Sequence, residues 1–109
     1  MDSYVVMLMP HQIEAKNLKA AEVLMDHYMP PDFCFDMIRV RKGIYEMDAD
    51  PMWIRAESED DALRLVRMLL PDCFEVRILT IPDALAEPDW AVQSLAEWLP
   101  AWNELRVEP

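Results

Sequence analysis

The sequence predicts an α+β domain in which an antiparallel four-stranded sheet carries two helices on one face, with an additional helix at the C-terminal end. Three observations lead to this prediction. Residues 53–81 contain a strand, a capped helix and a second strand in succession, and residues 4–9 form a continuous apolar run. The chain has 109 residues, of which 53% are hydrophobic, so a single domain can bury a core without disulfides or a structural metal.

The stretch 53–81 gives the clearest local signals. Apolar and polar side chains alternate over residues 53–57 and again over 74–78, as in strands with one buried face. Between them, Ser58 followed three residues later by Asp61 is typical of a helix N-terminus, and Pro71 disfavours helix beyond it. Apolar residues recur at helical spacing in this interval, at Ala62, Leu65, Val66, Leu69 and Leu70.

The first half of the chain supplies the remaining elements. Residues 4–9 are too uniformly apolar for a strand with a wet face, which predicts a central strand. Residues 11–28 have a helical pattern, and residues 33–42 are strand-like. Gly43 is expected to allow a turn without strain, and residues 46–51 are expected to form an acidic connection to the next strand. The order β-α-β-β-α-β matches the ferredoxin-like arrangement, in which the first and third strands are central.

A third helix is expected after this unit. The predicted domain, 1–109, comprises the sheet and two helices in 1–81 and a C-terminal helical extension in 82–109. Pro100 is expected to break or kink the third helix, and the polar residues 103–109 to fray.

The face of the sheet opposite the two helices is expected to be both apolar and cationic. If Ile38 and Val40 point toward the helices, alternate side chains point away from them. By the same alternation Asp36 would also point toward the helices. Either the strand therefore starts after Asp36, or a bulge changes the alternation. Either the third helix covers the opposite face, with Glu97 or Glu104 pairing with an arginine, or that face docks a second copy or another protein. Its predicted members are Arg39, Arg41, Trp53, Arg55 and Arg77.

The chain is strongly acidic. Twenty-one acidic against ten basic side chains give a formal charge of -11, which disfavours binding to free nucleic acid. The charge either serves solubility alone or attracts a basic partner. The candidate contact residues form two clusters, Glu46, Asp48 and Asp50, and Glu57, Glu59, Asp60 and Asp61. The second cluster also suits the start of a helix.

No motif for catalysis or cofactor binding is present. A single glycine excludes a glycine-rich phosphate loop, and no serine lies in a nucleophile elbow. The acidic residues at 46, 48, 50 and 57 match positions of a calcium loop, but Pro51 stands where that loop requires glycine. His11 and His27 lie too far apart along one helix, roughly 24 Å, to share an ion. No metal, cofactor or catalytic residue is therefore expected.

The two cysteines and the lack of membrane signals indicate a cytoplasmic protein. Cys34 and Cys73 have no C-x-x-C partner and are expected to be buried, unbridged thiols in a reducing compartment. No apolar run is long enough to span a bilayer, and the first residues lack the basic region of a secretory signal.

These observations favour a small cytosolic binding protein that is not an enzyme. It would dock on the basic surface of a larger partner and, where that partner handles nucleic acid, inhibit it by occupancy as a nucleic-acid mimic. In size and acidic composition the chain resembles phage-encoded inhibitors of restriction or CRISPR machinery, which block sites meant for DNA. The alternative is a homo-oligomeric regulatory or ligand-binding ferredoxin-like domain that pairs through the arginine-bearing face. An enzyme with an unrecognised site ranks third.

Overall fold

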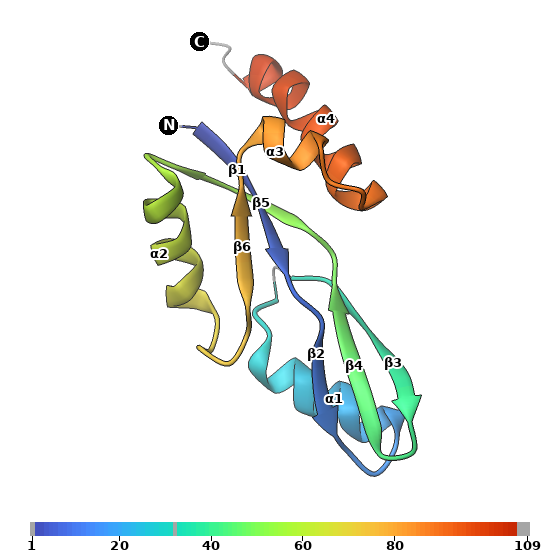
Figure 1. The fold of residues 1–109 in the computed structure, drawn as a ribbon. Helices are drawn as coiled ribbons and strands as arrows, with labels where there is room; N and C mark the ends of the chain where they lie inside the picture. Colours follow the sequence, from blue (N-terminus) through green and yellow to red (C-terminus); the bar gives the residue numbers. More distant parts are fainter. Residues whose placement is uncertain (1, 32, 107–109) are drawn as a thin grey trace.

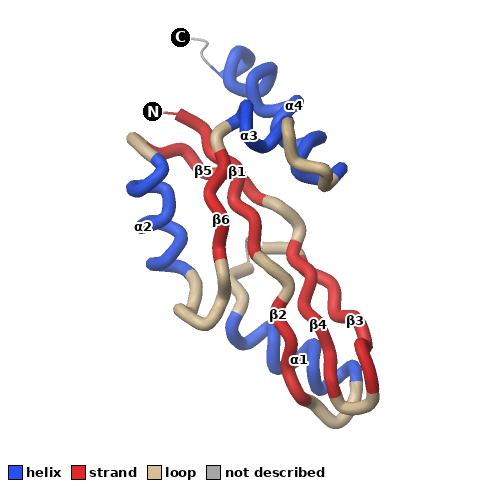
Figure 2. Tube along the Cα trace, in the orientation of Figure 1, coloured by secondary structure: helices blue, strands red, loops and turns tan. Residues whose placement is uncertain are grey.

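The computed structural model describes residues 2–31 and 33–106, and the side chains of these residues through Leu99. Within this part of the chain it shows an elongated α+β molecule, 51 × 27 × 23 Å, with four helices and two antiparallel sheets of three strands each (Figure 1 and Figure 2). The predicted mixture of helix and antiparallel sheet is therefore confirmed, but the single four-stranded sheet is replaced by two smaller ones.

The first sheet has the order β5-β1-β6 and is built around β1 (Asp2–Leu8). Its edge strands, β5 (Met52–Ala56) and β6 (Val76–Leu79), both run antiparallel to β1. The third predicted strand, which is β5, was expected to be central and is instead an edge of this sheet. Val5 and Val6, which are neighbours in sequence and therefore point to opposite faces, are 0% and 1% exposed. Both faces of the strand are thus covered, which explains its unbroken apolar sequence and confirms its predicted central position.

The second sheet has the order β2-β4-β3, with β2 (His11–Glu14), β3 (Phe35–Arg41) and β4 (Ile44–Ala49). Strands β3 and β4 form a hairpin whose turn contains Gly43 at φ +81°, a conformation that glycine adopts at little cost. The predicted turn is confirmed. The hairpin makes β4 the central strand of the second sheet.

The prediction of an acidic connection at residues 46–51 is wrong, because β4 occupies most of it. Tyr45 and Met47 are 6% and 0% exposed and alternate with Glu46 and Asp48, which are only half-buried. This is the period-two pattern of a strand with one covered face, and the acidic residues occupy its other face.

The predicted helix at residues 11–28 is also corrected. Its first part is β2, and α1 (Leu18–Tyr28) begins only after Asn17, whose side chain accepts a hydrogen bond of 2.8 Å from the backbone N–H of Ala20. Within β2, Ile13 lies opposite Tyr45 in the second sheet. Asn17 is a strong helix-capping residue, and it separates the two elements.

The chain is interrupted at two prolines between the two sheets. Val6 lies opposite Met52 in the first sheet and His11 lies opposite Met47 in the second, so both strands advance by five residues across the break and keep one register. Pro10 and Pro51 lie within the break, and proline cannot donate to a ladder of backbone hydrogen bonds.

On both strands, the alternation between core-facing and outward-facing residues shifts by one position at this break. Val6 and Leu8 face the main core before the break, whereas Ile13 faces it after the break. On the other strand, Met47 faces the core in β4 and Ile54 in β5. The phase change turns the two halves of the ladder relative to each other, and two sheets result.

Helix α2 (Glu59–Leu69) confirms the helix that was predicted within residues 53–81. It starts at Ser58, ends before Leu70, and buries Ala62 and Val66 against the first sheet. Helix α1 packs on the second sheet from the same side, because side chains of both helices join one core cluster: Val6, Leu8, Met25, Met29, Phe33, Met47, Val66, Leu70 and Phe74.

Helices α3 (Ile81–Leu85) and α4 (Trp90–Arg106) cover the opposite face of the first sheet (Figure 1). Their buried side chains pack against Val5 and Leu79, with Trp53 at the margin of this second cluster. Of the two outcomes expected at Pro100, a break or a kink, the break is wrong, because α4 continues to Arg106. Packing of the earlier turns on the sheet outweighs the cost of an interior proline, about 3 kcal/mol. Residues 103–106, expected to fray, are helical, and 107–109 lie outside the described residues.

Candidate functional site

The face of the second sheet that points away from α1, here called the outer face, gathers acidic side chains from two strands. In the register of the hairpin, Asp36 lies directly opposite Asp48, and Ile38 lies opposite Glu46. Helix α1 packs on β3 and β4 from the other side. Ile38 therefore stays 48% exposed, beside three carboxyl groups: Asp36, Glu46 and Asp48, here called the acidic triplet.

The members of the acidic triplet repel one another. Partial burial raises the pKa of Asp48 above its ordinary value, and the negative charge of Glu46, a hydrogen bond with the Glu46 side chain and the charge of Asp36 raise it further. The triplet therefore holds unfavourable negative charge that a cation would neutralise.

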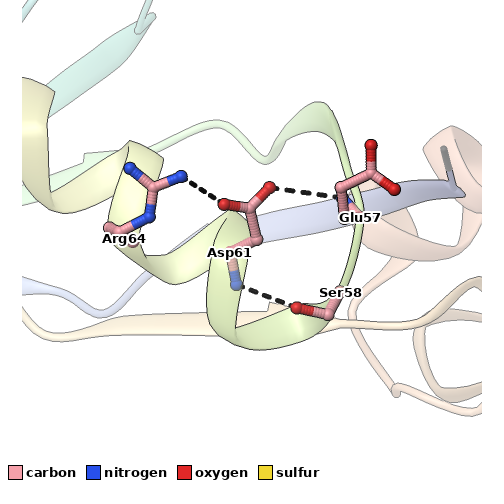
Figure 3. A network of polar contacts seen from close by, with 4 residues as sticks. All are labelled: Glu57, Ser58, Asp61 and Arg64. Carbon is pink, nitrogen blue, oxygen red and sulfur yellow. Dashed lines mark hydrogen bonds and ion pairs between the residues drawn. The ribbon is translucent and has the colours of Figure 1, made fainter.

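The second predicted acidic cluster organises the start of α2 (Figure 3). The backbone N–H of Asp61 donates to Ser58 Oγ at 3.2 Å, and the N–H of Glu57 donates to Asp61 Oδ2 at 3.3 Å. Asp61 also forms an ion pair with Arg64. The Arg64 hydrogen bond and the Glu57 N–H lower the pKa of Asp61, so this carboxylate stabilises the helix start whatever else it does.

The structure separates the two predicted clusters. Glu46 and Asp48 lie on the outer face, and Asp50 lies in the break between the sheets, where its N–H donates to the Cys34 carbonyl at 2.8 Å. Glu57 and the three carboxylates after it lie at the opposite end of the first sheet (Figure 1). About 30 Å of extended chain separates Asp48 from Glu57 at the usual rise per residue.

Asp36 belongs to the outer face but was not among the predicted contact residues. Its phase in the sequence conflicted with the proposed orientation of β3, and the conflict was the available signal. In the structure the two faces of β3 are exchanged relative to the prediction. Phe35 and Met37 pack against the core, whereas Ile38 and Val40 are each 48% exposed. The predicted inward orientation of Ile38 and Val40 is wrong.

The arginines do not share one face as predicted. A register shift between Arg39 and Arg41, as in a β-bulge, places Arg39 opposite Tyr45 and Arg41 opposite Ile44. Tyr45 and Ile44 are neighbours on β4 and point to opposite faces, so Arg39 lies on the α1 side and Arg41 on the outer side.

The arginines of the first sheet lie on the face that α3 and α4 cover. Arg77 forms an ion pair with Glu87 at 2.7 Å, in the segment between these helices, and Trp53 packs at the edge of their core cluster. Arg55 has the same phase on β5 as Trp53. Helical cover of this face was one of the two predicted explanations. The acidic partner of Arg77 is Glu87 rather than Glu97, and the Glu104 side chain lies outside the described part.

The histidines and cysteines take positions without a shared site. The His11 ring contacts Phe74 edge-on at 4.9 Å, and the His27 ring contacts Tyr28. Cys34 and Cys73 are both exposed free thiols, so their predicted burial is wrong. Among the described residues, no group of three or more His, Cys, Asp or Glu side chains is arranged to hold a metal ion.

A small pocket lies where the two sheets meet the start of α4. It has a volume of about 180 Å³ and is lined by Asp48 and Asp89 together with apolar side chains, among them Met7, Met9 and Val92. Asp89 also accepts a hydrogen bond from the N–H of Ala91 at 2.9 Å. One member of the acidic triplet thus reaches this pocket.

Comparisons with protein-family models, curated proteins and solved structures gave no match to this chain. In the part of the chain that the structure describes, no helix has the length and apolar composition needed to cross a bilayer.

Proposed function

We propose that this protein is a small acidic binding module that docks through the outer face of its second sheet on a basic surface of a larger partner. The partner could be a single protein or a complex, and proteins that handle nucleic acid carry such surfaces. Occupancy of a nucleic-acid site would then inhibit the partner, and no chemistry by this chain is needed. We also propose a cytoplasmic location, with which two free thiols agree.

One observation carries the proposal: the acidic triplet lies on a sheet face next to an exposed isoleucine. Carboxylates in this arrangement raise the pKa of Asp48, and a lysine or arginine from a partner would relieve their repulsion. Ile38, 48% exposed, adds apolar contact area beside the charges. A net charge of -11 would also steer a basic partner toward the molecule.

The start of α2 is a weaker candidate for the same role. Asp61 is engaged with Ser58, Glu57 and Arg64, so its charge is already partly neutralised within the helix. Pairing of two copies through the arginine-bearing face of the first sheet also has less support, because α3 and α4 pack there.

We further infer that the two sheets are a ferredoxin-like sheet divided at Pro10 and Pro51. The common register of the two ladders supports this inference, as does the order β5-β1-β6 with its central first strand.

The proposal is tested by affinity capture with matched variants. The bait is the wild type, the outer-face variant Asp36→Asn/Glu46→Gln/Asp48→Asn, or the control variant Glu57→Gln/Glu59→Gln/Asp60→Asn, which removes the same charge at the start of α2. A partner retained by the wild type and the control but lost with the outer-face variant supports the proposal. Equal retention by all three baits would contradict it. A recovered partner that binds DNA should release it when the wild-type protein is added.

A further inference from the structure

We propose that a second copy of this chain docks on the free edge of β3, so that two β3 strands pair antiparallel about a two-fold axis at Ile38. The second sheets of the two copies would then form one continuous six-stranded sheet. This inference concerns self-association and does not depend on the proposed partner.

The backbone of β3 has groups available for such pairing. Among the described strands, β3 lies at the edge of the second sheet and pairs with β4 alone. The N–H of Asp50 donates to the Cys34 carbonyl, so the Cys34 carbonyl is turned toward β4 rather than toward the free edge. Antiparallel pairs alternate, and the same register continues to Ile38. The N–H and C=O groups of Phe35 and Met37 are therefore turned toward the free edge.

A groove runs beside this edge, between β3 and α1. Its volume is about 500 Å³, and it is lined by Phe35 and Met37 of β3, Glu22 and Asp26 of α1, and neighbouring residues of the intervening segment. A groove between an edge strand and a helix is a recurring site for the addition of a strand. The apolar side chains of β3 would contact the added strand, and the carboxylates of α1 favour basic residues on it.

Strand β3 itself carries the complementary charges. Its first half lies beside Glu22, Asp26 and Asp36, whereas its second half contains Arg39 and Arg41, all five with exposed side chains. Antiparallel pairing of two copies brings the acidic half of each strand against the basic half of the other. An isologous interface needs this self-complementarity.

Because of the bulge in β3, opposite charges of the two copies meet on both faces of the sheet. Arg39 lies on the α1 side, where the partner copy presents Glu22 and Asp26. Arg41 lies on the outer side, where the partner copy presents Asp36. The two-fold axis at Ile38 also places the two half-exposed isoleucines against each other.

Charge exchange tests the pairing without changing buried residues. Arg39→Glu alone, and Glu22→Lys/Asp26→Lys alone, should each be monomeric, because like charges then meet twice. An equimolar mixture of the two variants should form a heterodimer, because opposite charges then meet at both contacts. One contact is native, Arg39 with Glu22 and Asp26, and in the other the positive and negative charges are exchanged. Arg55→Glu, an equal charge change on the first sheet, should leave the wild-type dimer intact.

Sedimentation velocity from micromolar to millimolar concentration provides the readout. A dimer for the wild type and the mixture, with monomers for each charge variant alone, supports the proposal. A monomeric wild type over this range, or a mixture that fails to associate, would overturn it.

Disulfide trapping tests the position of the axis. In a Cys34→Ser/Cys73→Ser background, Ile38→Cys should form an intermolecular disulfide, because directly opposed residues of this kind lie about 4.5 Å apart at Cα. Val40→Cys is the matched control, with the same 48% exposure of the native side chain on the same strand. Its two copies would lie about 13 Å apart, too far to bridge. Equal cross-linking of both variants, or of neither, would reject the proposed axis.

Discussion

At the residue scale, two aspartates with the same chemistry have opposite pKa shifts. Burial and the neighbouring carboxyl groups raise the pKa of Asp48, whereas Arg64 and the Glu57 N–H lower the pKa of Asp61. The sequence indicated the role of Asp61, because its partners lie within four residues of it. It did not indicate the state of Asp48, because Asp36 reaches it only through the pairing of two strands.

Asp48→Asn is expected to raise the free energy of unfolding at neutral pH. Folding raises the pKa of Asp48, so the Asp48 carboxyl group binds a proton more tightly in the folded protein than in the unfolded chain. The charged form of Asp48 therefore opposes folding. Relief of like charges across a strand pair is worth about 0.5 kcal/mol. The gain should vanish as the pH falls through the raised pKa, where wild-type Asp48 is protonated. Urea denaturation measures it, with exposed Asp72→Asn as control, and a loss of stability would refute the repulsion.

Asp61→Asn is expected to lower the free energy of unfolding at neutral pH. The lowered pKa means that charged Asp61 favours the folded state above its unfolded pKa, and that this contribution disappears as the pH falls through the folded pKa. Denaturation of wild type and variant over a pH series should therefore converge in acid. Asp60→Asn removes the same charge one residue earlier. An equally large effect there would show that only the general field of the helix matters.

At the element scale, the sequence predicted best where several local signals agreed. Helix α2 has a capping residue, helical spacing and a following proline, and its start is as predicted. Strands β2 and β4 were missed because four alternating residues resemble a helical stripe and because acidic residues concealed the alternation of Tyr45 and Met47. The bulge near Val40, which places Arg39 and Arg41 on opposite faces of β3, is marked by no local pattern.

Asn17→Ala is expected to destabilise the protein by about 1 kcal/mol, because the first turn of α1 loses its capping hydrogen bond. Thermal or chemical denaturation measures the loss. Asn17→Asp keeps an acceptor at the same place and should be nearly neutral. If Asn17→Ala unfolds like the wild type, the start of α1 does not depend on this residue.

At the scale of the whole molecule, α3 and α4 cover one face of the first sheet and, as far as the chain is described, leave the outer face of the second sheet uncovered. They bury Val92, Ala96 and Leu99 against the first sheet, whereas the acidic triplet lies on the second. The sequence suggested a covering helix, but not that the strands form two sheets and that, within the described part of the chain, the covering helices pack on the first of them only. Such long-range placement depends on packing that local patterns do not encode.

Leu99→Ala is expected to cost about 2–5 kcal/mol, because this side chain is fully buried between α4 and the first sheet. Leu85→Ala, at a site 44% exposed on α3, should cost much less. Denaturation curves of both variants test the packing. Similar small losses would mean that α4 is not anchored on the sheet.

The salt dependence of binding to a captured partner tests electrostatic docking most directly. Association constants should be measured by titration calorimetry at increasing ionic strength for the wild type and the outer-face variant. We expect wild-type affinity to fall steeply as salt screens the charges, and the variant to bind weakly with a shallower dependence. Wild-type affinity that stays constant from low to high salt would contradict docking through the acidic outer face.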